Sequence, residues 1–223
     1  MGSYETTIET LAGELTRIEA TFRDLTEPEW ETSTLLVPVD PGLPHWTVLE
    51  LAGHFDISIG LTRMLISDCG DLPPARDRTS FFINPRSETG PVVYQYAYKM
   101  VEGKTPADMP GVLAETFGRT IEECRAVPAG TVGPGYFAPM RVDEFAASRV
   151  VEAVVHGLDL TLALGRDPIA TAAGLALTAS ILDDLLARRT LGRRPADLAD
   201  DLAWVLAASG RAQHPDNRLP LIG

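Results

Sequence analysis

Cysteine, histidine and lysine are scarce in this chain. Of its 223 residues only two are cysteine, four are histidine and two are lysine. Cys69 and Cys124 form neither a CxxC pair nor a disulfide framework, which is typical of a protein kept in a reducing compartment. With neither base nor partner nearby in sequence, they are not candidates for a catalytic thiol. We therefore expect a cytoplasmic protein that folds without disulfides.

Basic residues are outnumbered by acidic ones. Lys and Arg together number 19 against 31 Asp and Glu, which gives a net charge of −12. No window of the sequence gathers Lys and Arg into a basic stripe. Binding to a phosphate backbone depends on such clusters. Nucleic acid is therefore not expected as a partner.

Long apolar runs are missing as well. No stretch reaches the ~20 apolar residues that a membrane helix needs. The most hydrophobic region, residues 145–164, carries four ionisable side chains. Residues 1–15 include three Glu and lack the apolar core of a signal peptide. Neither a membrane span nor a signal peptide is expected.

Helical periodicity dominates what is present. In the first segment the apolar residues recur at spacings of three and four, at Ile8, Leu11, Leu15, Ile18 and Phe22. The same pattern predicts further helices, so that the expected set is 4–25, 46–68, 107–125, 142–164, 170–188 and 196–208. The proline-rich interval 70–110 predicts a loop with one short helix through Tyr94 and Val101. With no β-type alternation and no repeat, the fold class is all-α.

Length and composition predict a single domain covering residues 1–223. Hydrophobic residues make up 45% of the chain and charged residues 22%, as in ordinary globular domains. Within it, residues 1–165 predict a four-helix bundle and residues 166–223 a helical C-terminal extension with an irregular tail.

The segment from Arg149 to Leu160 carries the most informative polar pattern. Helical residues advance by about 100°, so Arg149, Glu152, His156 and Asp159 share one quadrant, and four valines cover other directions. Ionisable groups on such a central helix are costly to bury unless they are paired or bound to a metal. A Glu and a His at positions i and i+4 can bind one ion. The alternative is that Glu152 and His156 only hydrogen-bond each other.

His54 adds a second helix to this pattern. It lies on an inward-facing stripe formed by Thr47, Leu51, His54, Ser58, Leu61 and Leu65. Together with Glu152 and His156 it makes a two-His, one-carboxylate set, which holds a divalent metal and leaves positions open for a ligand. Glu50 and His54 form a rival i, i+4 pair that the sequence leaves open. Such ligands suit zinc, nickel and iron, with zinc the default.

Two segments resemble a known family. Residues 46–54, WTVLELAGH, and residues 149–160, RVVEAVVHGLDL, resemble two signatures of the mycothiol-dependent maleylpyruvate isomerase family. That family belongs to the DinB-like superfamily of metal-binding four-helix bundles. Residues 133–140 resemble the loop that precedes the second signature, and residues 219–221 resemble a common terminus.

The resemblance implies a DinB-like four-helix bundle with His54, Glu152 and His156 as ligands of a divalent metal. It also implies mycothiol as a thiol cofactor. The isomerase after which the family is named resembles a bundle followed by a separate α/β domain, whereas residues 166–223 here predict helices and a tail. Maleylpyruvate itself is therefore not assigned as the substrate.

Four further polar residues are candidates for roles around this site. Arg149 is a candidate catalytic residue that could meet a substrate carboxylate, the alternative being an ion pair with Glu152 or Asp159. Asp159 is the other candidate catalytic residue: it could orient His156 by accepting its second N–H, the alternative being that it caps the helix or pairs elsewhere. Arg211 and Arg218 in the tail could close over an anionic ligand.

The remaining histidines and the aromatic residues of the long loop are weaker candidates. His45 and His214 are expected at the surface. The aromatic side chains of residues 81–98 either wall a pocket or anchor the loop to the bundle.

The leading hypothesis is a metal-dependent isomerase or thiol transferase acting on a small-molecule substrate. The metal would activate a thiol cofactor for attack on an electrophilic carbon. One alternative is a thiol-independent biosynthetic cyclase, isomerase or lyase that uses the ion as a Lewis acid. Another is a non-catalytic bundle that binds a ligand or metal. A homodimer is left open.

Overall fold

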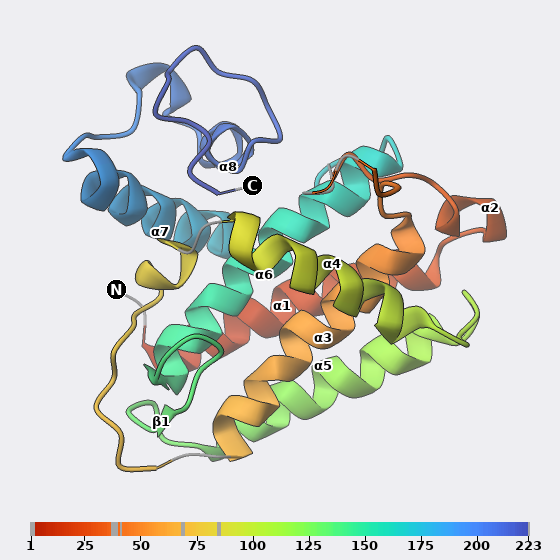
Figure 1. Cartoon of the computed structure of the whole chain (residues 1–223), viewed down its shortest axis with the longest axis horizontal. Helices are drawn as coiled ribbons and strands as arrows, with labels where there is room; N and C mark the ends of the chain where they lie inside the picture. Colours follow the sequence, from red (N-terminus) through yellow and green to blue (C-terminus); the bar gives the residue numbers. More distant parts are fainter. Residues whose placement is uncertain (1–2, 37–39, 41, 68–69, 84–85, 223) are drawn as a thin grey trace.

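The computed structural model of the chain confirms the all-α, DinB-like bundle. It describes every residue except 1–2, 37–39, 41, 68–69, 84–85 and 223. The long helices of the bundle are α1 (Tyr4–Arg23), α3 (Val48–Ser67), α5 (Met109–Ala126) and α6 (Val142–Ala163). Helices α1 and α3 each pack against both α5 and α6 (Figure 1). The interior between them is filled by aliphatic and aromatic side chains.

Helix α1 forms where the apolar spacing predicts it. The Ser3 hydroxyl accepts a hydrogen bond from the Thr6 backbone N–H and so caps the helix. A short helix, α2 (Glu27–Trp30), follows directly, which the sequence reading did not anticipate. Pro28 occupies its first turn, where the missing N–H costs nothing, and Thr26 and Glu29 form a capping box. Pro28 therefore starts a helix as well as preventing α1 from continuing.

The interval 70–110 contains more structure than the expected short helix. It includes the 3-10 turn η1 (Ser80–Ile83) and the 16-residue helix α4 (Arg86–Val101). Helix α4 crosses α3 closely (Figure 1). A Cβ atom at Gly53 would lie 2.6 Å from the Ala97 carbonyl oxygen, so only glycine allows this approach.

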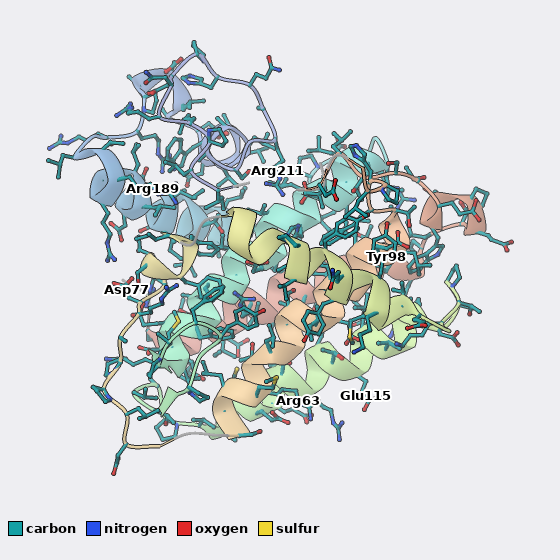
Figure 2. The ribbon with its side chains drawn as sticks, viewed as in Figure 1. Arg63, Asp77, Tyr98, Glu115, Arg189 and Arg211 are labelled. Carbon is teal, nitrogen blue, oxygen red and sulfur yellow. The ribbon has the colours of Figure 1, made fainter. Side chains whose placement is uncertain are left out.

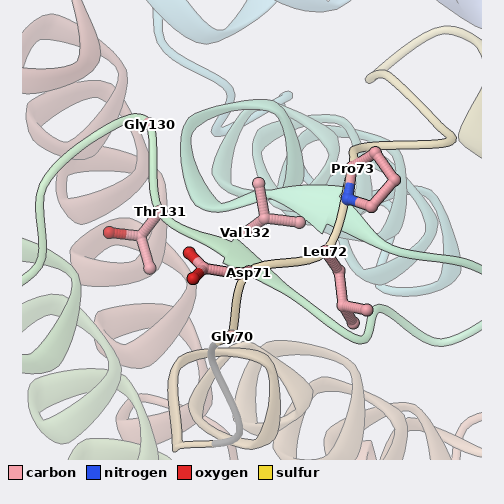
Figure 3. Close-up of a pocket in the computed structure, with 7 residues that line it drawn as sticks. All are labelled: Gly70, Asp71, Leu72, Pro73, Gly130, Thr131 and Val132. Atoms are coloured by element: carbon pink, nitrogen blue, oxygen red, sulfur yellow. The ribbon is translucent and has the colours of Figure 1, made fainter.

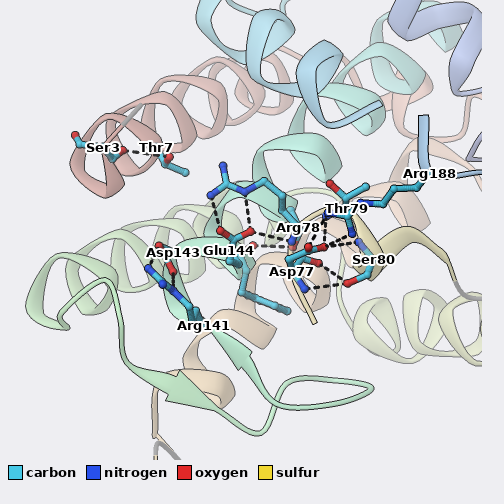
Figure 4. A network of polar contacts seen from close by, with 12 residues as sticks. Ser3, Thr7, Asp77, Arg78, Thr79, Ser80, Arg141, Asp143, Glu144 and Arg188 are labelled. Atoms are coloured by element: carbon cyan, nitrogen blue, oxygen red, sulfur yellow. Dashed lines mark hydrogen bonds and ion pairs between the residues drawn. The ribbon is translucent and has the colours of Figure 1, made fainter. Parts of the chain in front are cut away.

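Ion pairs hold the segment before α4 against the rest of the molecule (Figure 4). Arg78 pairs through two nitrogens with Glu144 on α6, at 2.7 and 2.8 Å. Asp77 pairs with Arg188 on the next helix, α7 (Ala172–Thr190), at 2.8 Å. These contacts place η1 beside α6 and α7.

A small hairpin precedes α6. Its strands β1 (Val132–Gly133) and β2 (Met140–Arg141) pair antiparallel. Two-residue strands are too short to show a period-two pattern, so the pattern of apolar residues does not reveal them. The connecting loop brings Phe137 to 5.7 Å from Phe81, measured between ring centroids.

The C-terminal residues pack onto the bundle. Helix α7 lies against α6, and α8 (Asp201–Ala208) lies against α7. The helix expected over 196–208 is divided into a 3-10 turn, η2 (Ala196–Leu198), and α8. The division occurs because the Asp200 carboxylate caps α8 by accepting from the Ala203 backbone N–H.

Across the described part of the chain, every helix is too short or too polar to traverse a bilayer.

Candidate metal centre

Three side chains from two helices converge inside the bundle. Glu152 and His156 lie one turn apart on α6, and the packing of α3 against α6 brings His54 to them. Oε2 of Glu152 lies 3.4 Å from Nε2 of His54 and 3.4 Å from Nε2 of His156. One donor atom from each residue fits within a 4.8 Å span. A single ion could contact all three.

His54 gives the strongest sign that this cluster accommodates a ligand. Its side chain is buried, and neither ring nitrogen has a hydrogen-bond partner among the residues that the structure describes. Burial and the nearby His156 lower the pKa of His54, which favours the neutral imidazole that metals bind. An unsatisfied buried imidazole is costly. Two imidazoles and a carboxylate therefore fit a divalent cation.

Glu152 supplies the negative charge of the cluster. Burial opposes its ionisation, but the charge of Arg149 and the neighbouring histidines hold its pKa well below the usual range. The carboxylate is consequently ionised at neutral pH, which is the form that coordinates metals.

The other ring nitrogen of His156 is bound to Asp159. Nδ1 lies 2.8 Å from Oδ2 of Asp159, three positions along the helix. Burial opposes the charge of Asp159, yet Arg211 and His156 lower its pKa to about 2. An ionised carboxylate only accepts hydrogen bonds, so Nδ1 of His156 carries a proton. Burial opposes a charge on His156, but Asp159 and Glu152 raise its pKa. In the neutral ring the lone pair is on Nε2, the nitrogen nearest Glu152, where it can bind a metal.

Arg149 is buried at the edge of the cluster. Its guanidinium stacks over the rings of Phe81 and Phe145, at 4.8 and 4.6 Å. Nη1 donates to the Ser58 carbonyl at 3.0 Å, and Nη2 lies 3.8 Å from Oε1 of Glu152. Of the two ion pairs considered from the sequence, the structure places Arg149 beside Glu152.

The cluster opens onto a cavity of about 800 Å³. His54, Glu152, His156 and Arg149 line it together with aromatic side chains, namely Trp46, Phe81, Phe82, Tyr94, Tyr96, Tyr136, Phe137 and Phe145. Four of the five aromatic residues in the stretch 81–98 therefore wall a pocket, and Tyr98 is the one that does not line it. Trp46 packs on His54 with ring centroids 5.2 Å apart. The cavity combines a charged end with a large apolar wall.

Residues 11–161 match the family model described as the mycothiol maleylpyruvate isomerase N-terminal domain. The chain belongs to this family. Searches of curated proteins and of solved structures found no match. The matched range of this family member includes His54, Glu152, His156 and Asp159 and ends within α6.

The structure of this maleylpyruvate isomerase family member shows which of two carboxylates, Glu50 or Glu152, lies beside His54. The Glu50 carboxylate accepts hydrogen bonds from the Thr47 hydroxyl and, at 2.8 Å, from the Thr47 backbone N–H. Glu50 therefore closes the first turn of α3, and Glu152 is the carboxylate that lies beside His54. His54 is the residue of that pair that faces the cluster.

The two tail arginines of the family member have different surroundings. Arg211 lines the cavity and binds Asp159. Arg218 pairs with Asp216 at 2.5 Å and lies beside Gly192. Sequence reasoning missed Arg189, which lines the cavity from α7, because nothing in the local spacing of α7 points to α6.

The histidines outside the cluster serve other purposes. His45 is exposed, as expected. His214 is half-buried instead of exposed, because Nε2 lies 3.1 Å from Asp197 and Nδ1 accepts from the Asp216 backbone N–H. These contacts fix the tail locally.

Within the described part of the chain, no cysteine is a candidate nucleophile. Cys124 is a free, buried thiol whose pKa is raised to about 12, chiefly by burial. Cys69 lies outside the described residues.

A second hollow lies at the hairpin end of the bundle (Figure 3). It is lined by residues 70–73 and 130–132, in which Asp71 is the one ionisable side chain. Among the described residues that line it, Asp71 has no second ionisable side chain beside it, so they form no cluster comparable with the centre.

Proposed function

We propose that this protein is a metal-dependent enzyme that uses a thiol cofactor to attack an electrophilic small molecule. The observation that carries the proposal is the largely buried His54–Glu152–His156 cluster, which lines a cavity of about 800 Å³. The family description names mycothiol and an isomerase. Mycothiol is therefore the proposed thiol, and isomerisation or S-transfer the proposed reaction.

The three side chains would hold one divalent cation. Zinc is the proposed ion, although nickel and iron accept the same ligands. When bound, such a cation leaves coordination positions open and stabilises a low-molecular-weight thiol as its thiolate. The cavity supplies space beside it for a second molecule.

The residues around the cluster would orient that second molecule. Arg149 is the proposed partner for a substrate carboxylate, because its guanidinium lines the cavity 3.8 Å from Glu152. The aromatic wall, which includes Trp46 and Phe81, would exclude water from the thiolate and hold the apolar part of the substrate.

The chemistry follows from where the thiolate goes. A thiol held in the cavity would supply reversible addition to the double bond of an enoate. The carbon–sulfur bond would leave a single bond free to rotate, and its cleavage would restore the double bond in the other geometry without consuming the thiol. If the adduct instead takes up a proton and is retained, the outcome is S-transfer.

The cavity wall supports a second candidate. Most of its lining is aromatic or aliphatic, which suits a natural-product intermediate as well as it suits a thiol. In this case the protein would be a cyclase, isomerase or lyase whose cation acts as a Lewis acid. Dependence of turnover on mycothiol separates the two candidates.

Metal content is the first measurement. Untagged protein, purified without an affinity metal, is compared by mass spectrometry with a His54→Ala, His156→Ala double variant. His45→Ala is the matched control, because His45 is exposed and outside the cluster. Near-stoichiometric metal in the parent and in the control, lost in the double variant, supports the proposal.

The proposal fails if the parent binds no metal after incubation with zinc, nickel, iron and manganese salts. Where metal is bound, turnover of α,β-unsaturated acids is measured with and without mycothiol. Turnover that does not depend on mycothiol favours the Lewis-acid alternative.

A further inference from the structure

Besides His156, a residue far along the chain also holds Asp159. Arg211, just after α8, donates from Nε to Oδ1 at 2.8 Å and from Nη2 to Oδ2 at 2.7 Å. Its third nitrogen, Nη1, donates to the Ser209 carbonyl at 2.5 Å. Arg211 lies where the C-terminal residues meet the bundle (Figure 2).

This ion pair is buried and well aligned. The side chain of Asp159 is 2% exposed and that of Arg211 is 9% exposed. A parallel pair of charge-assisted hydrogen bonds fixes both the position and the plane of a carboxylate. Because Oδ2 also accepts from Nδ1 of His156, fixing the carboxylate also fixes the direction of the imidazole.

We propose that Arg211 is a positioning residue for the metal centre, so that the tail (residues 209–222) helps to hold its ligands in place. Arg211 holds Asp159, and Asp159 holds the ring of His156 with Nε2 directed toward Glu152. The inference rests on the proposed metal site. It assigns a role to residues outside the range 11–161 that matches the family.

The tail has other anchors, so Arg211 is not needed simply to keep it in place. The backbone N–H groups of Leu221 and Ile222 both donate to the Ala208 carbonyl, at 2.7 and 3.1 Å. Arg189 donates to the carbonyls of Leu221 and, at 3.0 Å, Phe82. Arg211 is the tail residue whose side chain reaches Asp159.

The tail also forms part of the cavity wall. Pro220, Leu221 and Ile222 line the cavity together with Arg211. The same segment therefore contacts the space for the substrate and, through Asp159, the candidate ligand His156. Removing only the Arg211 side chain separates these two contributions.

The test measures zinc affinity by competition with a chromophoric chelator, using the full-length protein. Arg211→Gln removes the charge and the paired hydrogen bonds. Arg218→Gln is the matched control, because it removes a similar ion pair, with Asp216, from the same tail. We expect Arg211→Gln to weaken zinc binding by about 10- to 100-fold and Arg218→Gln to leave it within about twofold.

Two further variants distinguish positioning from general damage. Arg211→Lys keeps the charge but not the paired geometry, so we expect an affinity between those of the parent and Arg211→Gln. Asp159→Asn should weaken binding as much as Arg211→Gln, and the double variant should lose little more, because both act through one contact. The absorption spectrum of the cobalt-substituted protein should shift in Arg211→Gln and not in Arg218→Gln.

The outcomes separate this inference from the proposed function. If the parent binds zinc and Arg211→Gln binds it equally well, Arg211 has no positioning role. If the losses from Arg211→Gln and Asp159→Asn add in full, they do not act through one contact and the inference is overturned. A parent that binds no metal overturns both proposals. If Arg211→Gln does not fold, Arg211→Lys replaces it, and parent-like affinity and cobalt spectrum in that variant overturn the inference.

Discussion

Nε2 of His54 on α3 lies 3.4 Å from Oε2 of Glu152 on α6, a contact that lacks the geometry of a hydrogen bond. The same oxygen lies 3.4 Å from Nε2 of His156. Two imidazoles thus face one carboxylate oxygen without binding it tightly. That spacing suits an ion between them better than it suits a network of direct hydrogen bonds.

His54 should cost stability when no metal is present. Both ring nitrogens are buried without a hydrogen-bond partner among the described residues, and the ring packs on Trp46. We expect His54→Leu to be more stable than the parent in chelator, by about 1–3 kcal/mol, because the unsatisfied polar group is removed. Zinc should stabilise the parent, by about 2.7 kcal/mol at 100 times its dissociation constant, and leave the variant unchanged.

Urea unfolding with and without zinc measures both effects for His54→Leu. Leu51→Ala, at another buried position of α3, should be destabilised in either condition. Equal stabilisation of parent and His54→Leu by zinc would contradict the assignment.

Gly53 should be intolerant of any side chain. A Cβ there would lie 2.6 Å from the Ala97 carbonyl oxygen and against Val101, so α4 must move away from α3. We expect Gly53→Ala to lose about 1–3 kcal/mol of unfolding free energy through overpacking. Gly118→Ala is the control, because a Cβ there meets nothing within 4 Å on α5. That control should gain about 0.5–1 kcal/mol from helix propensity.

Substrate binding in the cavity is a second property to measure for Gly53→Ala. Because Tyr94 and Tyr96 on α4 line the cavity, displacement of α4 should also weaken substrate binding. Gly53→Ala with parental stability and parental KM would show that α4 does not lie as described.

Asp77 should make stability depend on pH in the acid range. Burial opposes its charge, but the ion pair with Arg188 and the hydrogen bonds from Ser80 lower its pKa to about 2. A carboxyl whose pKa is lower in the folded protein stabilises it above the unfolded value near 4, and this contribution is lost as the pH falls toward 2. Asp77→Asn should therefore lower stability at pH 6 and have little effect near pH 2.

Comparing Arg188→Gln with Asp77→Asn separates the ion pair of Asp77 from its other hydrogen bonds. Arg188→Gln removes the ion pair but leaves the Ser80 backbone N–H, which donates to Asp77 at 2.8 Å. We expect it to retain part of the acid dependence. Unfolding curves recorded from pH 2 to pH 6 test this, and identical profiles for parent and Asp77→Asn would rule the contribution out.

Cys124 should be unreactive in the folded protein. Burial raises its pKa to about 12, and the reactive thiolate is therefore rare at pH 8. In a Cys69→Ser background we expect no alkylation by iodoacetamide within hours, and rapid alkylation in urea. Mass spectrometry follows the modification, and fast labelling without denaturant would contradict the described burial.

Residues 166–223 should unfold together with the bundle, as one domain. Trp204 on α8 is buried, and its Nε1 donates to the Ala179 carbonyl on α7 at 3.3 Å. Since α7 packs on α6, we expect Trp204→Ala to destabilise the whole chain by about 3–5 kcal/mol in a single transition. Two separate transitions, by circular dichroism and by fluorescence of the remaining tryptophans, would indicate two domains.

Apolar periodicity predicts a helix well where it continues over several turns. The spacing from Ile8 to Phe22 predicts α1 because one face of that helix is buried. Helix α4 was underestimated because Pro91 falls inside it and its propensity is weak. Its position depends on the contact between Gly53 and Ala97, which spacing within one helix cannot show.

The sequence by itself determined the all-α class, and it named the three candidate ligands and Asp159. A 100° step places Glu152, His156 and Asp159 on one side of a single helix. His54 joins them through the resemblance of residues 46–54 and 149–160 to the signatures of the family. Only the tertiary structure decided between Glu50 and Glu152 as the carboxylate near His54, since that depends on how α3 packs against α6. Only the fold joins Arg211 to Asp159, because their proximity comes from the path of the chain through α7 and α8.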